Sequence, residues 1–168
     1  MADTSASTSP EARLAALGLT LPAVPAPIGM FRLGRIEGGL LFLSGQGPIL
    51  EDGRLATGKV GREVTADQAR HHAMRTGLVL LAAAQSLLGG LDRIGGVTKV
   101  LGFVNAVDSF DNHPYVIDGC SQLFHDVLGP AAVHARSAIG VASLPGRITV
   151  EIEAIFALAE NIPLRGCS

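Results

Sequence analysis

The fold is decided by residues 134–157, which read HARSAIGVASLPGRITVEIEAIFA. Small and apolar residues alternate through 137–142, and a turn signal, Ser-Leu-Pro-Gly, follows at 143–146. After the turn, large apolar residues alternate with polar ones that include Glu151 and Glu153. Because side chains alternate across a strand, the two glutamates share one face and the apolar side chains share the other. The stretch therefore predicts one β-hairpin with a buried face.

A single arginine, Arg136, stands at the mouth of the first of these strands. Together with Glu151 and Glu153 it makes an unusual set, because only 17% of the residues of this chain are charged. Two interpretations fit the set. The three groups either form a site that binds and activates a ligand, or they form a structural salt bridge across the sheet.

The composition indicates one globular domain. A chain of 168 residues, 48% of them hydrophobic, buries about two-thirds of the surface that its unfolded form exposes. So few charges also indicate that some apolar surface is buried between subunits. The net charge is −2, with 13 basic and 15 acidic residues and no basic run, which argues against nucleic-acid binding through a broad positive face.

The cysteines and the chain start favour the cytoplasm. Cys120 and Cys167 lie far apart and form neither a metal-binding spacing nor a disulfide framework. No apolar run reaches the roughly 18–20 residues that span a bilayer, and residues 1–10 lack the features of a signal peptide. We therefore expect a cytoplasmic protein with no membrane partner.

The N-terminal third predicts a tail, a short helix and a hairpin. Residues 1–8 are rich in Ser, Thr and Ala and are expected to be a disordered tail, so that a single domain covers 9–168. Ser9 and the proline after it predict the start of a short helix. Strands are expected at 30–36 and 40–44, joined by a Gly-Gly turn. The glycines after the second strand either let a ligand approach the backbone or form a plain bend.

The middle of the chain predicts two helices and a central strand. A capping box at 65–68 begins the longest helix, which carries an apolar stripe and ends at a Gly-Gly pair. Residues 97–107 are apolar on both faces, as in a central strand, and a second helix runs from about 114 to 128. The order β-β-α-β-α-β-β after a leading helix predicts an α+β sandwich, a mixed sheet with both helices on one face. A partner subunit would cover the other face.

Other chemical groups favour structural interpretations. His71 and His72 are neighbours on a helix and point about 100 degrees apart, so they form no metal pair. His113 beside a proline is typical of a cap or turn, and His134 is best interpreted as a loop residue, although it could flank a site near Arg136. Cys120 is expected to be a core residue. We expect no metal site.

Several short motifs stand in one order along residues 28–157, and together they are specific. They are Ser-Gly-Gln at 44–46, Ala-Arg-Ser at 135–137, Leu-Pro at 144–145 and Val-Glu-Ile-Glu-Ala-Ile at 150–155. With these motifs the chain resembles the Rid family, the reactive-intermediate (enamine/imine) deaminases, which are also known as YjgF or endoribonuclease L-PSP-like proteins. The resemblance implies a chorismate-mutase-like α+β fold, a homotrimer with clefts between subunits, and no cofactor.

The resemblance also implies roles for two residues and shows three departures. The substrate arginine of the family falls on Arg136, and the acid associated with its catalytic water falls on Glu151, fifteen positions later. Phe31 stands where the deaminases commonly have a tyrosine, and Ala138 where some members have a small thiol residue. An asparagine usual in the second helix has no clear counterpart around 116–118. The chain therefore resembles a divergent branch.

The expected activity follows from charge. Arg136 would bind the carboxylate of a 2-imino or enamine acid through a two-pronged contact. Glu151, with a shifted pKa, would deprotonate the water that attacks the C=N carbon, giving a 2-keto acid and ammonia. The cleft would be completed by the Phe31 ring and by backbone groups at Ser44, Gly45, Ala138 and Ile139. A non-catalytic protein that binds small carboxylates is the main alternative, and a ribonuclease or translation inhibitor fits poorly with an acidic, aromatic-poor chain.

Overall fold

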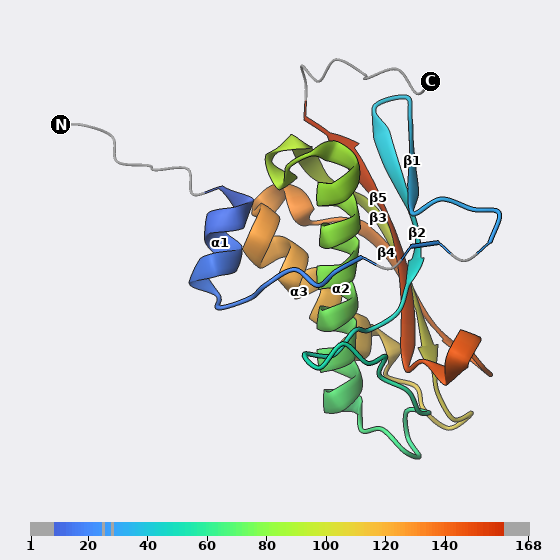
Figure 1. Cartoon of the computed structure of the whole chain (residues 1–168). Coiled ribbons are helices and arrows are strands. Elements are labelled where there is room, and N and C mark those ends of the chain that lie inside the picture. Colours follow the sequence, from blue (N-terminus) through green and yellow to red (C-terminus); the bar gives the residue numbers. More distant parts are fainter. Residues whose placement is uncertain (1–8, 25, 28, 160–168) are drawn as a thin grey trace.

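The structure is a computed structural model that describes residues 9–24, 26–27 and 29–159. It has an α+β architecture in which two helices pack on one face of a five-stranded mixed sheet (Figure 1). This agrees with the predicted fold class. The predicted tail at 1–8 and Cys167 lie outside the described residues.

The elements follow the predicted order, with three additional short 3-10 helices, η1 to η3, in the connections. Their bounds are α1 Pro10–Ala16, β1 Gly34–Glu37, β2 Leu40–Gln46, α2 Ala66–Leu88, η1 Leu91–Arg93, β3 Ile94–Asn105, α3 His113–Leu128, η2 Pro130–Ala132, β4 Ala135–Val141, η3 Pro145–Arg147 and β5 Val150–Leu158. The strands lie in the order β1-β2-β5-β3-β4. The predicted central strand, β3, is an interior strand, and β5 occupies the middle of the sheet.

The helix starts form as their capping residues predict. The Ser9 side chain accepts a hydrogen bond from the backbone N–H of Ala12 at 3.2 Å and so caps α1. Thr65 and Gln68 make both hydrogen bonds of a capping box at the start of α2. These bonds are local in sequence, which is why the sequence pattern predicts them.

The predicted hairpin at 134–157 is wrong. β4 and β5 do not pair with each other, because β3 lies between them. β3 pairs with β4 in parallel, through the crossover helix α3, and with β5 in antiparallel orientation. The eight residues between β4 and β5, which include η3, carry the chain past the end of β3. Alternation predicts both strands correctly, but it carries no information about which neighbour each strand takes.

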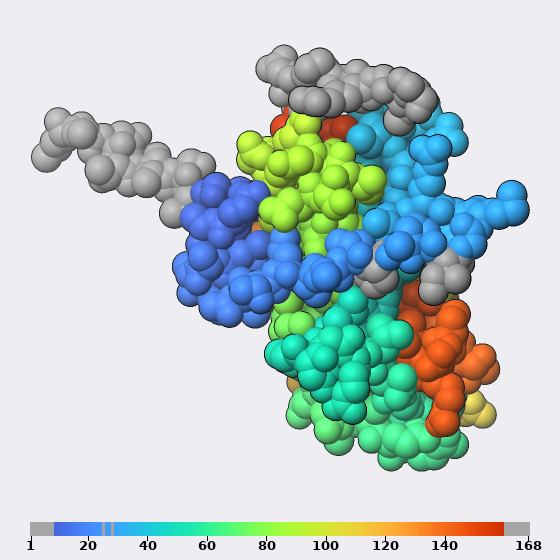
Figure 2. Space-filling view, viewed as in Figure 1, coloured from blue at the N-terminus to red at the C-terminus, as the bar shows by residue number. Residues whose placement is uncertain are grey.

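The first strand begins later than predicted, at Gly34 instead of residue 30. Regular pairing of β1 with β2 starts at Gly34, opposite Leu43. Two bonds continue the contact, from the Ser44 N–H to the Leu33 carbonyl and from the Ser44 hydroxyl to the backbone carbonyl of residue 32. The segment 29–33 projects beyond the rest of the chain (Figures 1 and 2).

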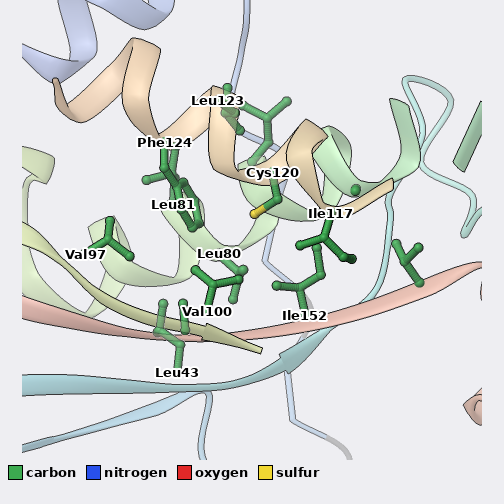
Figure 3. Close-up of a cluster of buried hydrophobic side chains, with 14 of the residues drawn as sticks. Leu43, Leu80, Leu81, Val97, Val100, Ile117, Cys120, Leu123, Phe124 and Ile152 are labelled. Carbon is green, nitrogen blue, oxygen red and sulfur yellow. The ribbon is translucent and has the colours of Figure 1, made fainter. Parts of the chain in front are cut away.

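The core lies between the sheet and the two long helices. Apolar side chains of β2, β3 and β5 meet those of α2 and α3 there, including Leu81, Val100, Phe124 and Ile152 (Figure 3). The rings of Phe124 and Phe156 pack edge to face, with centroids 5.4 Å apart. In the described part of the chain, no helix has the length and apolar character of a membrane span.

The opposite face of the sheet is open in the single chain. It presents Phe42, Leu101, Phe103, Ile139 and Ile155, which are partly or largely exposed. In Figure 1 both long helices lie on the other side of the sheet. A monomer rarely leaves an apolar sheet face of this kind in water, which is consistent with the expectation of a partner subunit.

Gly119 allows α2 and α3 to approach closely, because a Cβ there would collide with the backbone carbonyl oxygen of Arg70. In an ordinary helix interior, Gly→Ala stabilises by about 1 kcal/mol. We expect Gly119→Ala to destabilise the protein instead, by about 1–3 kcal/mol, since backbone must move to make room. Urea unfolding at a fixed protein concentration measures the difference. Ser86→Ala, at an exposed position of α2, is the control and should change the free energy of unfolding by less than about 0.5 kcal/mol. Stabilisation by Gly119→Ala would contradict the close helix contact.

Candidate active site

Arg136 lies on β4, at the edge of the sheet, and points to the face that the helices cover. Its register partner is the core residue Val100, and paired residues of neighbouring strands share a face. The Nη1 atom donates hydrogen bonds to Asp118 Oδ1 at 2.7 Å and to Ser121 Oγ at 3.0 Å, both on α3. The Arg136 side chain keeps 23% of its surface exposed. The guanidinium is thus held on one side and open to a ligand on another.

His134 extends this network. Its Nδ1 lies 2.6 Å from the Ala132 carbonyl oxygen, and its Nε2 lies 3.1 Å from Ser121 Oγ. Because a carbonyl only accepts, Nδ1 carries the proton and Nε2 accepts from the Ser121 hydroxyl. Burial lowers the pKa of His134, the carbonyl contact partly opposes this, and the Arg136 charge lowers the pKa further. The chain of bonds therefore runs from Arg136 through Ser121 to a neutral His134.

Glu151 lies on β5 and points to the open face, as does its register partner Phe103. The alternation predicted for β5 is confirmed, with Ile152 and Phe156 buried on the helix side. Burial raises the pKa of Glu151, and the negative charge of Glu153 raises it further. A carboxyl group in this environment takes up a proton more readily than an ordinary glutamate.

Gly45 makes room for the Glu151 carboxyl group. A Cβ at Gly45 would collide with Glu151 Oε1, so a larger residue would push the carboxyl group out of this position. Ser44 and Gly45 form the irregular part of β2, opposite β5. The structure therefore places the predicted residue Gly45 against Glu151, with Ser44 next to it in the chain and its hydroxyl bonded to the backbone.

A cavity of about 500 Å³ opens next to this position, beside β1, β2 and β5. Its lining includes Arg32, Arg35, Phe42, Ser44, Glu153 and Ile155. Two arginines and a glutamate around a partly apolar hollow suit a small polar ligand or a side chain of another subunit.

Arg136 and Glu151 lie on opposite faces of the sheet within one chain. Ala138 shares the helix-side face with Arg136, whereas Ile139 lies on the open face with Glu151. Phe31 belongs to the projecting segment and is 53% exposed. A single chain therefore brings Glu151, Ser44 and Gly45 together and holds Arg136 with Ala138 elsewhere.

The structural salt bridge between Arg136 and Glu151 or Glu153 does not form, because Arg136 pairs with Asp118. The interpretation of Cys120 as a core residue is confirmed, and burial raises the pKa of its thiol. Among the described residues, no group of three His, Cys, Asp or Glu side chains could hold a metal ion.

Sequence reasoning did not identify Asp118 and Ser121. They lie three positions apart in a predicted helix, and therefore on one face, but two polar residues of this kind are common on exposed helix surfaces. His134 precedes β4 as a loop residue, as predicted, and it also flanks the Arg136 site through Ser121. All three depend on the parallel placement of β4 against α3, which no local pattern specifies.

Residues 11–156 match the family model described as "YjgF/chorismate mutase-like, putative endoribonuclease". This chain belongs to that family. Protein TCP17 of Trypanosoma cruzi is 37% identical over 148 residues, which cover 88% of this chain and 92% of TCP17. The crystal structure of Atu1372, a protein of unknown function from Agrobacterium tumefaciens, is 41% identical, with a TM-score of 0.82 over 89% of this chain and 94% of that one.

A more distant solved structure has a ligand. The crystal structure of E. coli TdcF with bound serine is 28% identical to this chain, with a TM-score of 0.52 over 80% of this chain and 92% of TdcF. The family membership predicted from Arg136, Glu151 and their surrounding motifs is therefore confirmed, and so is the chorismate-mutase-like fold.

The raised pKa of Glu151 predicts how stability depends on pH. The folded pKa exceeds the unfolded value near 4.5, so the charged carboxylate costs stability above that pH and costs nothing below it. We expect Glu151→Gln to stabilise the fold at pH 7 by a fraction of a kcal/mol, because water screens the exposed part of the group. Thermal melts from pH 4 to 8 test this. The gain should vanish at pH 4, and Glu37→Gln, at an exposed position in β1, should show no such trend. If the stability gained by Glu151→Gln grows toward pH 4, the raised pKa of Glu151 is contradicted.

Proposed function

We propose that this YjgF-family protein is a hydrolytic deaminase that converts small 2-imino or enamine acids to 2-keto acids and ammonia. It acts in the cytoplasm as a homotrimer with its clefts between subunits and requires no cofactor. The observation that carries the proposal is the state of two side chains, Arg136 and Glu151. An arginine is held in place at a sheet edge with part of its fork open, and a glutamate with a raised pKa lies beside a glycine.

Arg136 binds the carboxylate of the substrate. Asp118 and Ser121 accept hydrogen bonds from Nη1 of Arg136. The N–H donors of Nε and Nη2 remain for a two-pronged contact with the carboxylate of the substrate. A lysine carries one ammonium group and cannot serve Asp118, Ser121 and a ligand in the same geometry. The serine bound in TdcF, a small acid with a carboxylate, supports a ligand of this class.

Glu151 is the general base. Its raised pKa brings it closer to neutrality, where a base both exists as the anion and accepts a proton readily. It takes a proton from water as the water oxygen bonds to the C=N carbon. Glu151 passes this proton to the nitrogen, which gives a carbinolamine. Glu151 then takes the remaining hydroxyl proton and delivers it to the nitrogen as the C–N bond breaks, so that a 2-keto acid and ammonia are released.

A second copy of the chain brings the two groups together. Because Arg136 and Glu151 leave the sheet on opposite faces, a cleft that contains both needs β4 of one subunit against the open face of another. The apolar residues of that face support its burial, and the projecting segment 29–33 is placed to reach a neighbouring subunit. Phe31 would wall the cleft.

A carboxylate-binding protein without turnover is the second candidate, and the missing hydroxyl at Phe31 favours it. An endoribonuclease, the activity in the family description, has less support here. The net charge is −2 and aromatic residues are only 4%, so the chain offers little for binding phosphates or stacking bases.

Subunit mixing tests the shared cleft. Arg136→Gln and Glu151→Gln should each abolish keto-acid formation from freshly generated 2-imino acids. When the two variants are co-expressed in equal amounts, about a quarter of the clefts take an intact Arg136 from one copy and an intact Glu151 from the next, so about a quarter of the activity should return.

The control for mixing is the double variant co-expressed with the wild-type chain. A cleft built from two copies then keeps about a quarter of the activity, whereas a cleft within one chain keeps about half. No recovery from the two single variants would rule out the shared cleft. Light scattering that finds a single 17.3 kDa chain would rule out the trimer.

Phe31→Tyr tests the missing hydroxyl. One added hydrogen bond to the water or substrate is expected to raise imine hydrolysis by about ten- to a hundredfold, or roughly 1.5–3 kcal/mol. Glu151→Gln in the same background should remove the gain. If Phe31→Tyr changes nothing and Glu151→Gln leaves ligand binding intact, the chain is a carboxylate-binding relative and not a deaminase.

A further inference from the structure

Asp118 is more exposed than the arginine it pairs with. Its side chain keeps 43% of its surface accessible, against 23% for Arg136. Oδ1 accepts the hydrogen bond from Arg136 Nη1, and the nearest cation to Oδ2 is Arg70 Nη1 at 3.8 Å, too far for a hydrogen bond. The carboxylate therefore keeps capacity to accept a hydrogen bond from a ligand.

The fold does not need Asp118 to hold Arg136. Ser121 also accepts from Nη1, and Ser121 is itself fixed by His134, whose ring is fixed by the Ala132 carbonyl. An ion pair as open as the one between Asp118 and Arg136 contributes little to stability. Its effect on the charge seen by a ligand is larger, because it places an anion 2.7 Å from the guanidinium.

We propose that Asp118 makes the Arg136 site select acids that carry a positively charged nitrogen beside the carboxylate. This inference rests on the proposed function, in which Arg136 binds the substrate carboxylate. The favoured ligands are protonated 2-imino acids and the zwitterions of small amino acids. Plain carboxylates, including the 2-keto acid product, are disfavoured.

The charges fit this class of ligand. A plain carboxylate is attracted by Arg136 and repelled by Asp118, so part of the attraction is lost. In a 2-imino acid the carboxylate and the nitrogen are both attached to C2, so Arg136 can bind one while Asp118 accepts a hydrogen bond from the other. Arg70 stacks over the Tyr115 ring at 4.6 Å and donates to the Tyr115 carbonyl, so Asp118 is not its closest partner.

The selection assists the reaction. Asp118 stabilises the iminium form of the substrate, whose carbon is more open to attack by water than that of the neutral imine. After the C–N bond breaks, the keto acid has no cation for Asp118, so the product binds more weakly than the substrate.

Two ligands that differ only in the ammonium group test the proposal, L-alanine and propionate. NMR titration of the full-length protein should show alanine binding about tenfold more tightly than propionate. Asp118→Asn keeps the shape of the side chain and removes its charge. It should weaken alanine binding about tenfold and strengthen propionate binding several-fold. Asp126→Asn is the matched control, since Asp126 lies on the same helix with 38% exposure and, within the described part of the chain, bonds to Gln122 and His125 of α3.

The outcomes separate this proposal from the proposed function. Equal affinity of the wild type for both ligands, or an equal loss of both with Asp118→Asn, would show that Asp118 only positions Arg136. If the variant unfolds, Asp118→Ser gives the same comparison. If neither ligand binds the wild type, both proposals fail. If the preference and its reversal are found but imine hydrolysis is absent, the charge selection stands and the deaminase function fails.

Discussion

The parallel pairing of β3 with β4 is the constraint on which the rest of this structure depends. It places Arg136 next to Val100 and therefore on the face covered by α3, where Asp118 and Ser121 accept hydrogen bonds from its guanidinium. The same pairing leaves the other edge of β3 for β5, whose register turns Glu151 to the open face. One choice of strand neighbour thus decides which chemical groups surround the arginine and which do not.

As a result, Arg136 and Glu151 lie in different electrostatic surroundings. The Asp118 carboxylate and the Ser121 hydroxyl accept hydrogen bonds from Arg136, and His134 supports Ser121, so the guanidinium is fixed in position. Among the described residues of one chain, no cation forms an ion pair with Glu151, and Glu153 adds a like charge two residues away on the same face. The guanidinium and the carboxyl group therefore lie on opposite faces of the sheet, each in surroundings of its own.

Local features of this fold could be predicted from the sequence, and long-range ones could not. The starts of α1 and α2 follow from Ser9 and Thr65, and the buried face of β5 follows from alternation, because each involves residues a few positions apart. The prediction of a hairpin at 134–157 was wrong because the neighbour of each strand is set by packing across the whole sheet. Arg136 and Glu151 were found through the motifs around them, whereas Asp118 is 18 positions from its partner and depends on the crossover helix.

The length of the connection between α3 and β4 is itself part of the site. One hydrogen bond on each face of the sheet depends on the register of β4. Lys99 donates to Ser137 on the open side, and Arg136 donates to Asp118 on the helix side. Since side chains alternate with every residue, a deletion or insertion of one residue between Gly129 and His134 would exchange the two faces and aim Ser137 at α3. Relatives with a different number of residues in this connection must compensate elsewhere to keep an arginine in place. Loop length, and not only residue identity, therefore limits how this branch of the family can diverge.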